Sequence, residues 1–102
     1  MNRARSYLFV PGSNKEVIRK AIHSKADSVI LDLEDAVAVK EKDSAREIVK
    51  EALIKFREEK ELIVRINDLD TPFWEKDLKC ALSNGAAGIM IPKSESSEGM
   101  KT

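Results

Sequence analysis

Polar side chains stand at the ends of two short apolar segments of this sequence. Asp32 and Glu34 lie at the end of the first segment, and Arg65 and Asn67 lie at the end of the second. Because side chains alternate along a strand, each pair lies on one face if the strand continues through it. A charge buried there without a partner costs roughly several kcal/mol, and pairing the acids with Arg65 reduces that cost. A guanidinium fixed in this way is suited to a bidentate grip on a carboxylate ligand.

The same residues also allow a structural interpretation, in which Asp32 and Arg65 form an ion pair without any chemistry. Asp32, Glu34 and Asp35 are also candidates for binding a metal ion, either directly or through water. Lys93 follows a buried segment and is either the Schiff-base lysine of a metal-free aldolase or an ordinary lysine at the rim of the sheet.

Other reactive residue types have simpler interpretations. His23, the only histidine, is expected at the surface, and Cys80, the only cysteine, is expected to pack within a helix. A single cysteine excludes an internal disulfide and fits a reducing compartment. Gly12 either admits a phosphate at the start of a helix or only permits a tight turn.

Short apolar segments and amphipathic helices must position these groups. Continuous apolar runs of this length are typical of parallel strands that are buried on both faces. The clearest helical pattern runs from Lys42 to Glu59, with one apolar stripe. The first helix is expected to begin at Ser13, which has capping-box spacing with Glu16, and the third is expected after Thr71. The predicted strands lie near residues 6–10, 28–33, 62–66 and 88–91.

The resulting order, β-α-β-α-β-α-β, predicts an α/β fold with parallel strands and right-handed crossovers. In such folds, ligands bind at the carboxyl ends of the strands. A polar cluster follows each predicted strand, so we expect the clusters to converge on one rim. The tail at residues 94–102 is polar and has no clear pattern.

The composition is that of one globular domain and excludes several classes of function. The 102 residues are 42% apolar and carry 18 basic and 18 acidic side chains, so no field of one sign attracts nucleic acid or anionic lipid. No apolar run approaches the roughly 20 residues that cross a bilayer. We therefore expect a cytoplasmic protein with no nucleic-acid or membrane partner.

Four collinear segments resemble the citrate lyase β-subunit family, within the wider HpcH/HpaI aldolase group. Each segment alone is weak evidence, but their order across nearly the whole chain is specific. The segments are RSYLFVPGS at 5–13, LDLEDAV at 31–37 with EKDSAR at 41–46, VRIN at 64–67 with LDT at 69–71, and GIMIPK at 88–93.

This resemblance implies the N-terminal half of a TIM-type (β/α)8 barrel that acts as a carbon–carbon lyase. Substrates in the family are citryl or malyl thioesters of CoA or of an acyl carrier protein. They are cleaved to oxaloacetate or glyoxylate and an acetyl thioester, with Mg²⁺ as a Lewis acid. A homo-oligomer or a lyase complex is also expected.

The resemblance also assigns roles to individual residues. Arg65 is expected to bind the oxo-acid carboxylate and stabilise the enolate-like species, with Asn67 as a second substrate-binding residue. Glu34 and Asp35 are expected to act in catalysis near the metal, which they reach through water. The candidates for binding the phosphates of the thioester are Arg5 and Lys15.

One departure from the family concerns the metal. The direct ligands of the family, a Glu and an Asp, lie beyond the fourth strand, so we expect them after Thr102. Eight strands need roughly 200 residues, and this sequence supplies four, so we expect a truncated form with two exposed sheet edges. Two other functions remain open. One is a non-catalytic fragment or assembly half that needs a partner chain, and the other is a metal-dependent aldolase acting on free 2-oxo acids.

Overall fold

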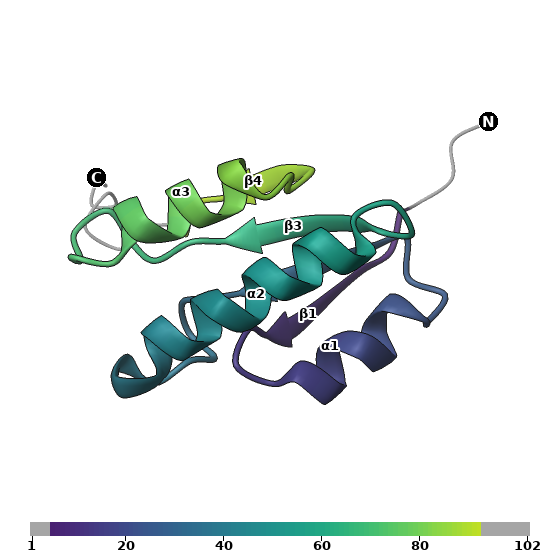
Figure 1. The fold of residues 1–102 in the computed structure, drawn as a ribbon, viewed down its shortest axis with the longest axis horizontal. Coiled ribbons are helices and arrows are strands. Elements are labelled where there is room, and N and C mark those ends of the chain that lie inside the picture. Colours follow the sequence, from purple (N-terminus) through teal and green to yellow (C-terminus); the bar gives the residue numbers. More distant parts are fainter. Residues whose placement is uncertain (1–4, 93–102) are drawn as a thin grey trace, which may run out of the picture.

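Four parallel strands form one sheet in the order β1-β2-β3-β4, and helices alternate with them along the chain (Figure 1). The structure is a computed structural model, and it describes residues 5–92. Within that range, no helix is long and apolar enough to cross a membrane. The elements are β1 (Tyr7–Pro11), α1 (Lys15–Ile22), β2 (Ser28–Asp32), the 3-10 helix η1 (Val39–Glu41), α2 (Lys42–Phe56), β3 (Glu61–Arg65), α3 (Trp74–Ser83) and β4 (Gly88–Met90).

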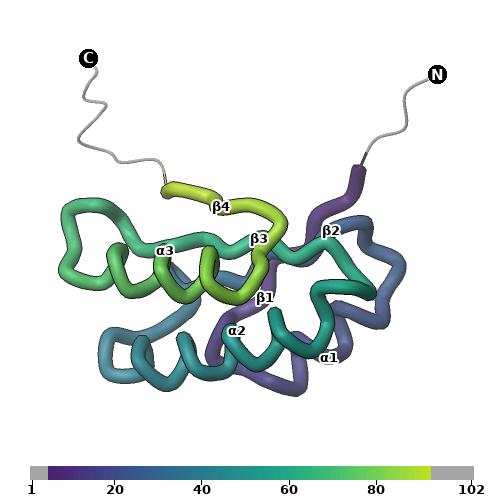
Figure 2. The backbone as a smooth tube through the Cα atoms, turned by 45° about the horizontal axis from the view of Figure 1, so that its top comes forward, coloured from purple at the N-terminus to yellow at the C-terminus, as the bar shows by residue number. Residues whose placement is uncertain are grey.

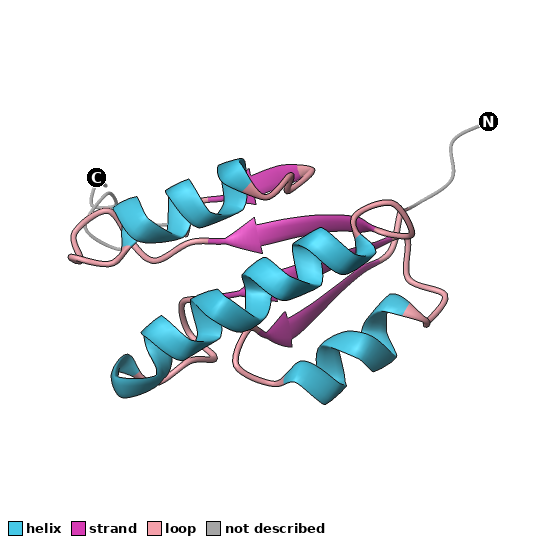
Figure 3. Cartoon of the chain, in the orientation of Figure 1, coloured by secondary structure: helices cyan, strands magenta, loops and turns pink. Residues whose placement is uncertain are grey.

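The three α-helices all cover the same face of the sheet, as Figures 1 and 2 show. Each helix follows one strand and returns the chain to the start of the next, which makes every strand pair parallel (Figure 3). A doubly wound sheet reverses its strand order and has helices on both faces. Consecutive parallel strands with helices on one face instead form part of the wall of a (β/α) barrel. The fold class predicted from the sequence is therefore confirmed.

The hydrophobic core lies between the sheet and the helix layer. Val29, Leu31, Leu62 and Val64 lie on the central strands, and each is at most 1% exposed. Burying side chains of this size stabilises the fold by about 1.5–3 kcal/mol each. The alternate residues of the strands face the side without helices, where Phe9 is 50% exposed. The period of two along each strand thus separates core residues from those that can reach a ligand.

The first helix begins later than the sequence predicted. α1 starts at Lys15 rather than Ser13, because Asn14 is the N-cap. The side-chain oxygen of Asn14 accepts a hydrogen bond from the Val17 N–H at 3.0 Å. Asn is as good a cap as Ser, so the capping-box spacing identified the right turn but the wrong residue.

The later helices are shorter than their patterns suggested. α2 begins at Lys42, as predicted, but it ends at Phe56 rather than Glu59. The backbone N–H of Lys60 donates to the Phe56 carbonyl at 3.1 Å, and this turn leads directly into β3. α3 begins at Trp74. The strands differ from their predicted ranges by at most one residue at either end.

Gly12 is packed too closely to carry a side chain. Its N–H donates to the Asp32 carbonyl at 2.7 Å. A Cβ atom there would lie 2.9 Å from both that carbonyl oxygen and Val49 Cγ2. The close approach of β1 and β2 explains this glycine without a phosphate ligand.

We therefore expect Gly12→Ala to destabilise the fold by about 1–3 kcal/mol, because the added methyl group displaces the end of β2. Chemical denaturation measures this change. Gly88→Ala is the matched control, since a Cβ there makes only an ordinary 3.6 Å contact with Ile63. Equal stability of the two variants would show that the approach at Gly12 is not tight.

Candidate functional site

The last residues of β2 and β3 form a bidentate ion pair at the carboxyl ends of the strands. Asp32 and Arg65 are register partners in the parallel ladder. Arg65 Nε donates to Asp32 Oδ1 at 3.0 Å, and Nη2 donates to Oδ2 at 2.8 Å. The Asp32 side chain is 4% exposed and that of Arg65 is 23% exposed. The carboxylate is thus buried, while the guanidinium reaches the open face.

Asp32 also anchors the loop that follows β2. It accepts the Glu34 N–H at 2.8 Å and the Ala36 N–H at 3.3 Å. Burial by itself would raise the pKa of Asp32, but the hydrogen bonds from Arg65 and from these amides lower it below its ordinary value. The hydrogen bond to Asp32 in turn raises the pKa of Arg65. Both groups are therefore charged at neutral pH and hold each other in one orientation.

Arg65 has one open edge on its guanidinium. Asp32 occupies the edge formed by Nε and Nη2, and Nη1 has no hydrogen-bond partner within residues 5–92. The Phe9 ring centroid lies 5.3 Å from Arg65 Cζ, a cation–π contact that restrains the plane of the guanidinium. The edge formed by Nη1 and Nη2 can therefore donate two parallel hydrogen bonds to a carboxylate.

Glu34 and Asp35 add negative charge at the same end of the sheet. Glu34 Oε1 lies 3.8 Å from Arg65 Nε, and its side chain is 25% exposed. Burial, followed by the charge of Asp35, raises the pKa of Glu34, although Arg65 opposes this shift. The described part of the chain contains no group of three or more His, Cys, Asp or Glu residues that could hold a metal ion. These acids therefore do not form a complete metal site by themselves within residues 5–92.

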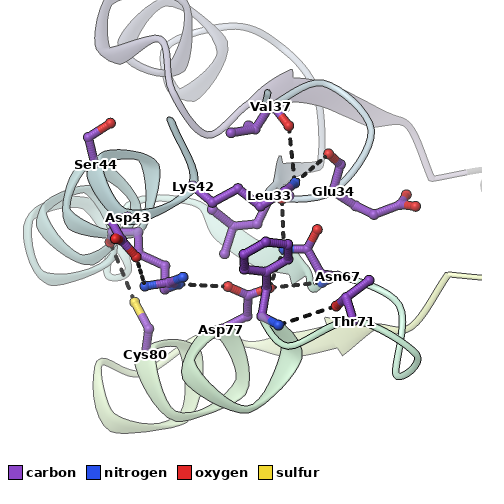
Figure 4. Close-up of polar contacts among 12 residues, drawn as sticks. Leu33, Glu34, Val37, Lys42, Asp43, Ser44, Asn67, Thr71, Asp77 and Cys80 are labelled. Atoms are coloured by element: carbon purple, nitrogen blue, oxygen red, sulfur yellow. Dashed lines mark hydrogen bonds and ion pairs between the residues drawn. The ribbon is translucent and has the colours of Figure 1, made fainter. Parts of the chain in front are cut away.

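Asn67 does not share the open face with Arg65, and this expectation was wrong. β3 ends at Arg65, and the Asn67 side chain lies between the β2 end and α3 (Figure 4). Its Nδ2 donates to the Leu33 carbonyl at 2.9 Å and to Asp77 Oδ2 at 2.5 Å. Side chains alternate between the two faces only within a strand, so alternation along β3 could not predict the direction of the Asn67 side chain. Asn67 is 3% exposed, and its amide joins neighbouring strand ends instead of reaching a ligand.

Two buried charges near the site were missed from the sequence. Asp77 is completely buried and accepts hydrogen bonds from Arg46 Nε at 2.9 Å and from the Asn67 N–H at 2.9 Å. Lys42 is 6% exposed. A signal was available, because both residues occupy positions on apolar helix stripes. Lys42 lies one turn before the buried Ala45 on α2, and Asp77 lies one turn before the buried Ala81 on α3.

The candidates for phosphate binding do not gather beside Arg65. Arg5 donates to Ser28 Oγ at 2.9 Å and pairs with Glu61. Ser28 and Glu61 are the first residues of β2 and β3, so Arg5 lies at the amino ends of the strands. Arg5 therefore lies at the opposite end of the sheet from Arg65, because a segment that precedes β1 enters a parallel sheet at its amino end. Lys15 forms an exposed ion pair with Glu51 on the helix layer, at 3.6 Å, and Lys93 lies outside the described residues.

His23 and Cys80 make local contacts in the helix layer. The rings of His23 and Phe56 meet edge to face, with their centroids 6.0 Å apart. The Cys80 thiol donates to the Arg46 carbonyl at 3.5 Å, and burial raises its pKa. A thiol with a raised pKa is a poor nucleophile, so packing explains this cysteine.

Comparisons with known proteins connect this geometry to one group of enzymes. Citrate lyase subunit beta from Leuconostoc mesenteroides is 47% identical over 93 residues, which are 89% of this chain and 30% of the relative. L-malyl-CoA/beta-methylmalyl-CoA lyase from Rhodobacter capsulatus is 45% identical over 93 residues, which are 87% of this chain and 29% of the relative. The chain thus spans about a third of the length of these curated relatives.

Solved structures that resemble this chain belong to the same group of proteins. Protein CitE from Mycobacterium tuberculosis, in complex with magnesium, acetoacetate and coenzyme A, superposes with a TM-score of 0.73 and 34% identity. That match covers 93% of this chain and 34% of the other. The family described as HpcH/HpaI aldolase/citrate lyase matches residues 5–102. This chain therefore belongs to the HpcH/HpaI aldolase/citrate lyase family.

Proposed function

We propose that this chain contributes the carboxylate-binding site of a magnesium-dependent carbon–carbon lyase. The enzyme cleaves a citryl or malyl thioester to an oxo-acid, oxaloacetate or glyoxylate, and an acetyl thioester. The observation that supports this best is the guanidinium of Arg65, which Asp32 holds with one edge open at the carboxyl ends of the strands. Relatives named citrate lyase and malyl-CoA lyase support the class of reaction.

The proposed role of Arg65 follows from the charge movement of the cleavage. The substrate hydroxyl loses its proton and becomes the oxo group, while the carbon–carbon bond breaks. The electron pair of that bond passes to the acetyl thioester carbon, which then takes up a proton. In this proposal, Arg65 binds the carboxylate beside the new oxo group, and its positive charge helps to stabilise the enolate-like species that carries the electron pair until the proton arrives.

The acidic loop suits Mg²⁺ by its donor chemistry. Mg²⁺ prefers carboxylate oxygens and retains several waters. Asp32, Glu34 and Asp35 outnumber the nearby cations Arg65 and Lys42, and burial, followed by the charge of Asp35, raises the pKa of Glu34. We propose that Glu34 and Asp35 contact the ion through water and that its direct ligands lie after Thr102. Bound Mg²⁺ would supply Lewis-acid polarisation of the oxo group.

The carrier of the thioester is proposed to be CoA or an acyl carrier protein. Support comes from the CitE structure with coenzyme A and from relatives named as a lyase subunit. The word subunit in these names supports a lyase complex, and a homo-oligomer is proposed as the alternative. Lys15 lies just beyond the carboxyl end of β1 and is kept as a candidate for the carrier's phosphates.

The proposal predicts thioester cleavage that depends on Mg²⁺. With the full-length natural polypeptide, citryl-CoA or malyl-CoA should yield an oxo-acid, and chelation by EDTA should abolish this activity until Mg²⁺ is restored. Trapping the oxo-acid as its phenylhydrazone measures the reaction. Failure to form an oxo-acid from either thioester, with Mg²⁺ present, would contradict the proposal.

Two controls separate the competing functions. In the first control, free 2-oxo acids and aldehydes replace the thioester as substrates, and their conversion would indicate a metal-dependent aldolase. Release of free CoA without any oxo-acid would indicate thioester hydrolysis, the activity for which a relative from Cereibacter sphaeroides, (3S)-malyl-CoA thioesterase, is named. A polypeptide inactive in all these assays would be the non-catalytic alternative.

A further inference from the structure

Lys42 is a buried cation that binds only the loop between β2 and η1. Its Nζ donates to the carbonyl oxygens of Leu33 at 2.9 Å, Glu34 at 3.0 Å and Val37 at 3.0 Å (Figure 4). A lysine ammonium has three N–H donors, so this loop uses all of them. The side chain therefore has no donor left for a carboxylate or a ligand.

The position of Lys42 is unfavourable for a positive charge, so the hydrogen bonds to the loop must offset the cost. The residue is 6% exposed, and burial lowers its pKa, although Asp77 and Glu34 oppose this shift. It is also the first residue of α2, where the helix dipole disfavours a positive charge. Within residues 5–92, no carboxylate lies within ion-pair distance of its Nζ, and its nearest aromatic partner is Phe73, at 5.6 Å from the ring centroid. The benefit that offsets these costs is the set of three carbonyl bonds.

The same loop is held from its amide side by Asp32. Asp32 accepts the N–H groups of Glu34 and Ala36, and Lys42 donates to the carbonyls of residues 33, 34 and 37. Glu34 is therefore fixed through both halves of its backbone, by an anion on one side and a cation on the other. Its side chain points away from Lys42 in Figure 4, and its Oε1 lies 3.8 Å from Arg65 Nε. Opposite charges thus set the backbone from which Glu34 and Asp35 project.

We propose that Lys42 is a positioning residue, which holds the loop so that Glu34 and Asp35 present their carboxylates to the magnesium-bound oxo-acid. This inference rests on the proposed lyase function. This positioning role is distinct from simply stabilising the hydrophobic core, because the three carbonyls that Lys42 binds belong to the loop that carries Glu34 and Asp35. Residues of this kind typically change metal affinity or activity by about 10–100-fold when they are replaced.

The experiment replaces Lys42 with Met in the full-length natural polypeptide. Met keeps most of the apolar stem but cannot donate to the carbonyls. We expect the magnesium dissociation constant, measured by calorimetry with the metal alone, to rise by about 10–100-fold, with kcat reduced and the KM for the thioester little changed. Lys40→Met is the matched control, because Lys40 is exposed two residues earlier and should leave all three quantities unchanged.

Chemical rescue distinguishes positioning from a general loss of stability. Lys42→Ala removes the atoms that propylammonium contains, so added propylammonium should restore both magnesium affinity and kcat in this variant but not in Lys42→Met. Amide hydrogen exchange at Glu34 and Ala36 should slow again as rescue proceeds. If Lys42→Met does not fold, Lys42→Ala with propylammonium replaces it in every measurement.

The outcomes separate this inference from the proposed function. Normal magnesium affinity and kcat in a folded Lys42→Met variant would overturn the role of Lys42 and leave the lyase function intact. Reduced values that propylammonium does not restore in Lys42→Ala would also overturn it. An unmodified protein that neither binds magnesium nor forms an oxo-acid would remove the proposed function, and the role of Lys42 with it.

Discussion

Arg65→Ala should lower the kcat of thioester cleavage by about 10²–10³-fold, the effect of removing one preorganised donor from a developing negative charge. The KM should also rise, because the open edge of the guanidinium binds the carboxylate before the reaction begins. Steady-state kinetics with citryl-CoA or malyl-CoA measure both. The kcat and KM of Arg65→Lys should lie between those of the unmodified protein and Arg65→Ala, since Lys keeps the charge but lacks the planar pair of donors.

The same substitution leaves Asp32 without its main partner, so stability must be controlled. Arg65→Lys supplies a cation to Asp32 and shows how much of the loss comes from the missing ion pair. Arg19→Ala removes an exposed arginine, whose contact with Glu16 is 3.9 Å long, and should leave the kinetics unchanged. Unchanged kcat and KM in a folded Arg65→Ala protein would exclude Arg65 from the mechanism.

Asp77→Ala should reduce the free energy of unfolding by about 3–5 kcal/mol, the usual effect of breaking a buried ion pair by removing one partner. Asp77 is completely buried, and its carboxylate accepts hydrogen bonds from Arg46 and from both nitrogen donors of Asn67. Without it, these donors are buried and unsatisfied where α2, α3 and the end of β3 meet. Urea denaturation measures the change as a shift of the midpoint at constant slope.

Asp43, the second acid that contacts Arg46, provides a matched control for Asp77. Asp43 lies 2.8 Å from Arg46 Nη1, but its side chain is 88% exposed. Asp43→Ala should therefore cost about 0–1 kcal/mol, as exposed pairs do. Equal effects of the two substitutions would show that burial of Asp77 does not strengthen its interactions.

The positions of Asp32 and Arg65 followed from the sequence, because they depend on regular structure. Short apolar segments locate the strands, and parallel pairing brings equivalent strand ends together. Alternation then places Asp32 and Arg65 on the same face, where they are register partners. The family resemblance, drawn from segments along nearly the whole chain, is confirmed by the family match over residues 5–102.

Residues beyond the strand ends could not be placed by the same rule. Asn67 lies after β3, where hydrogen bonds to Leu33 and Asp77 determine its orientation instead of strand pleating. Lys42 occupies a position on the apolar stripe of α2, which indicates burial, but no sequence period describes the loop carbonyls that its ammonium binds. Arg5 illustrates a different point. The family resemblance makes it a candidate for phosphate binding, and its place before β1 determines which end of the sheet it reaches.

The paired register of β2 and β3 has a consequence for how this site tolerates variation. Asp32 and Arg65 are the final residues of hydrogen-bonded strands, so the backbone ladder, rather than any connecting segment, sets the separation of their Cα atoms. Insertions or deletions in the turns beyond them can change what the guanidinium meets without moving the guanidinium itself. One scaffold can in this way present the same anchor for a carboxylate to acyl groups of different size.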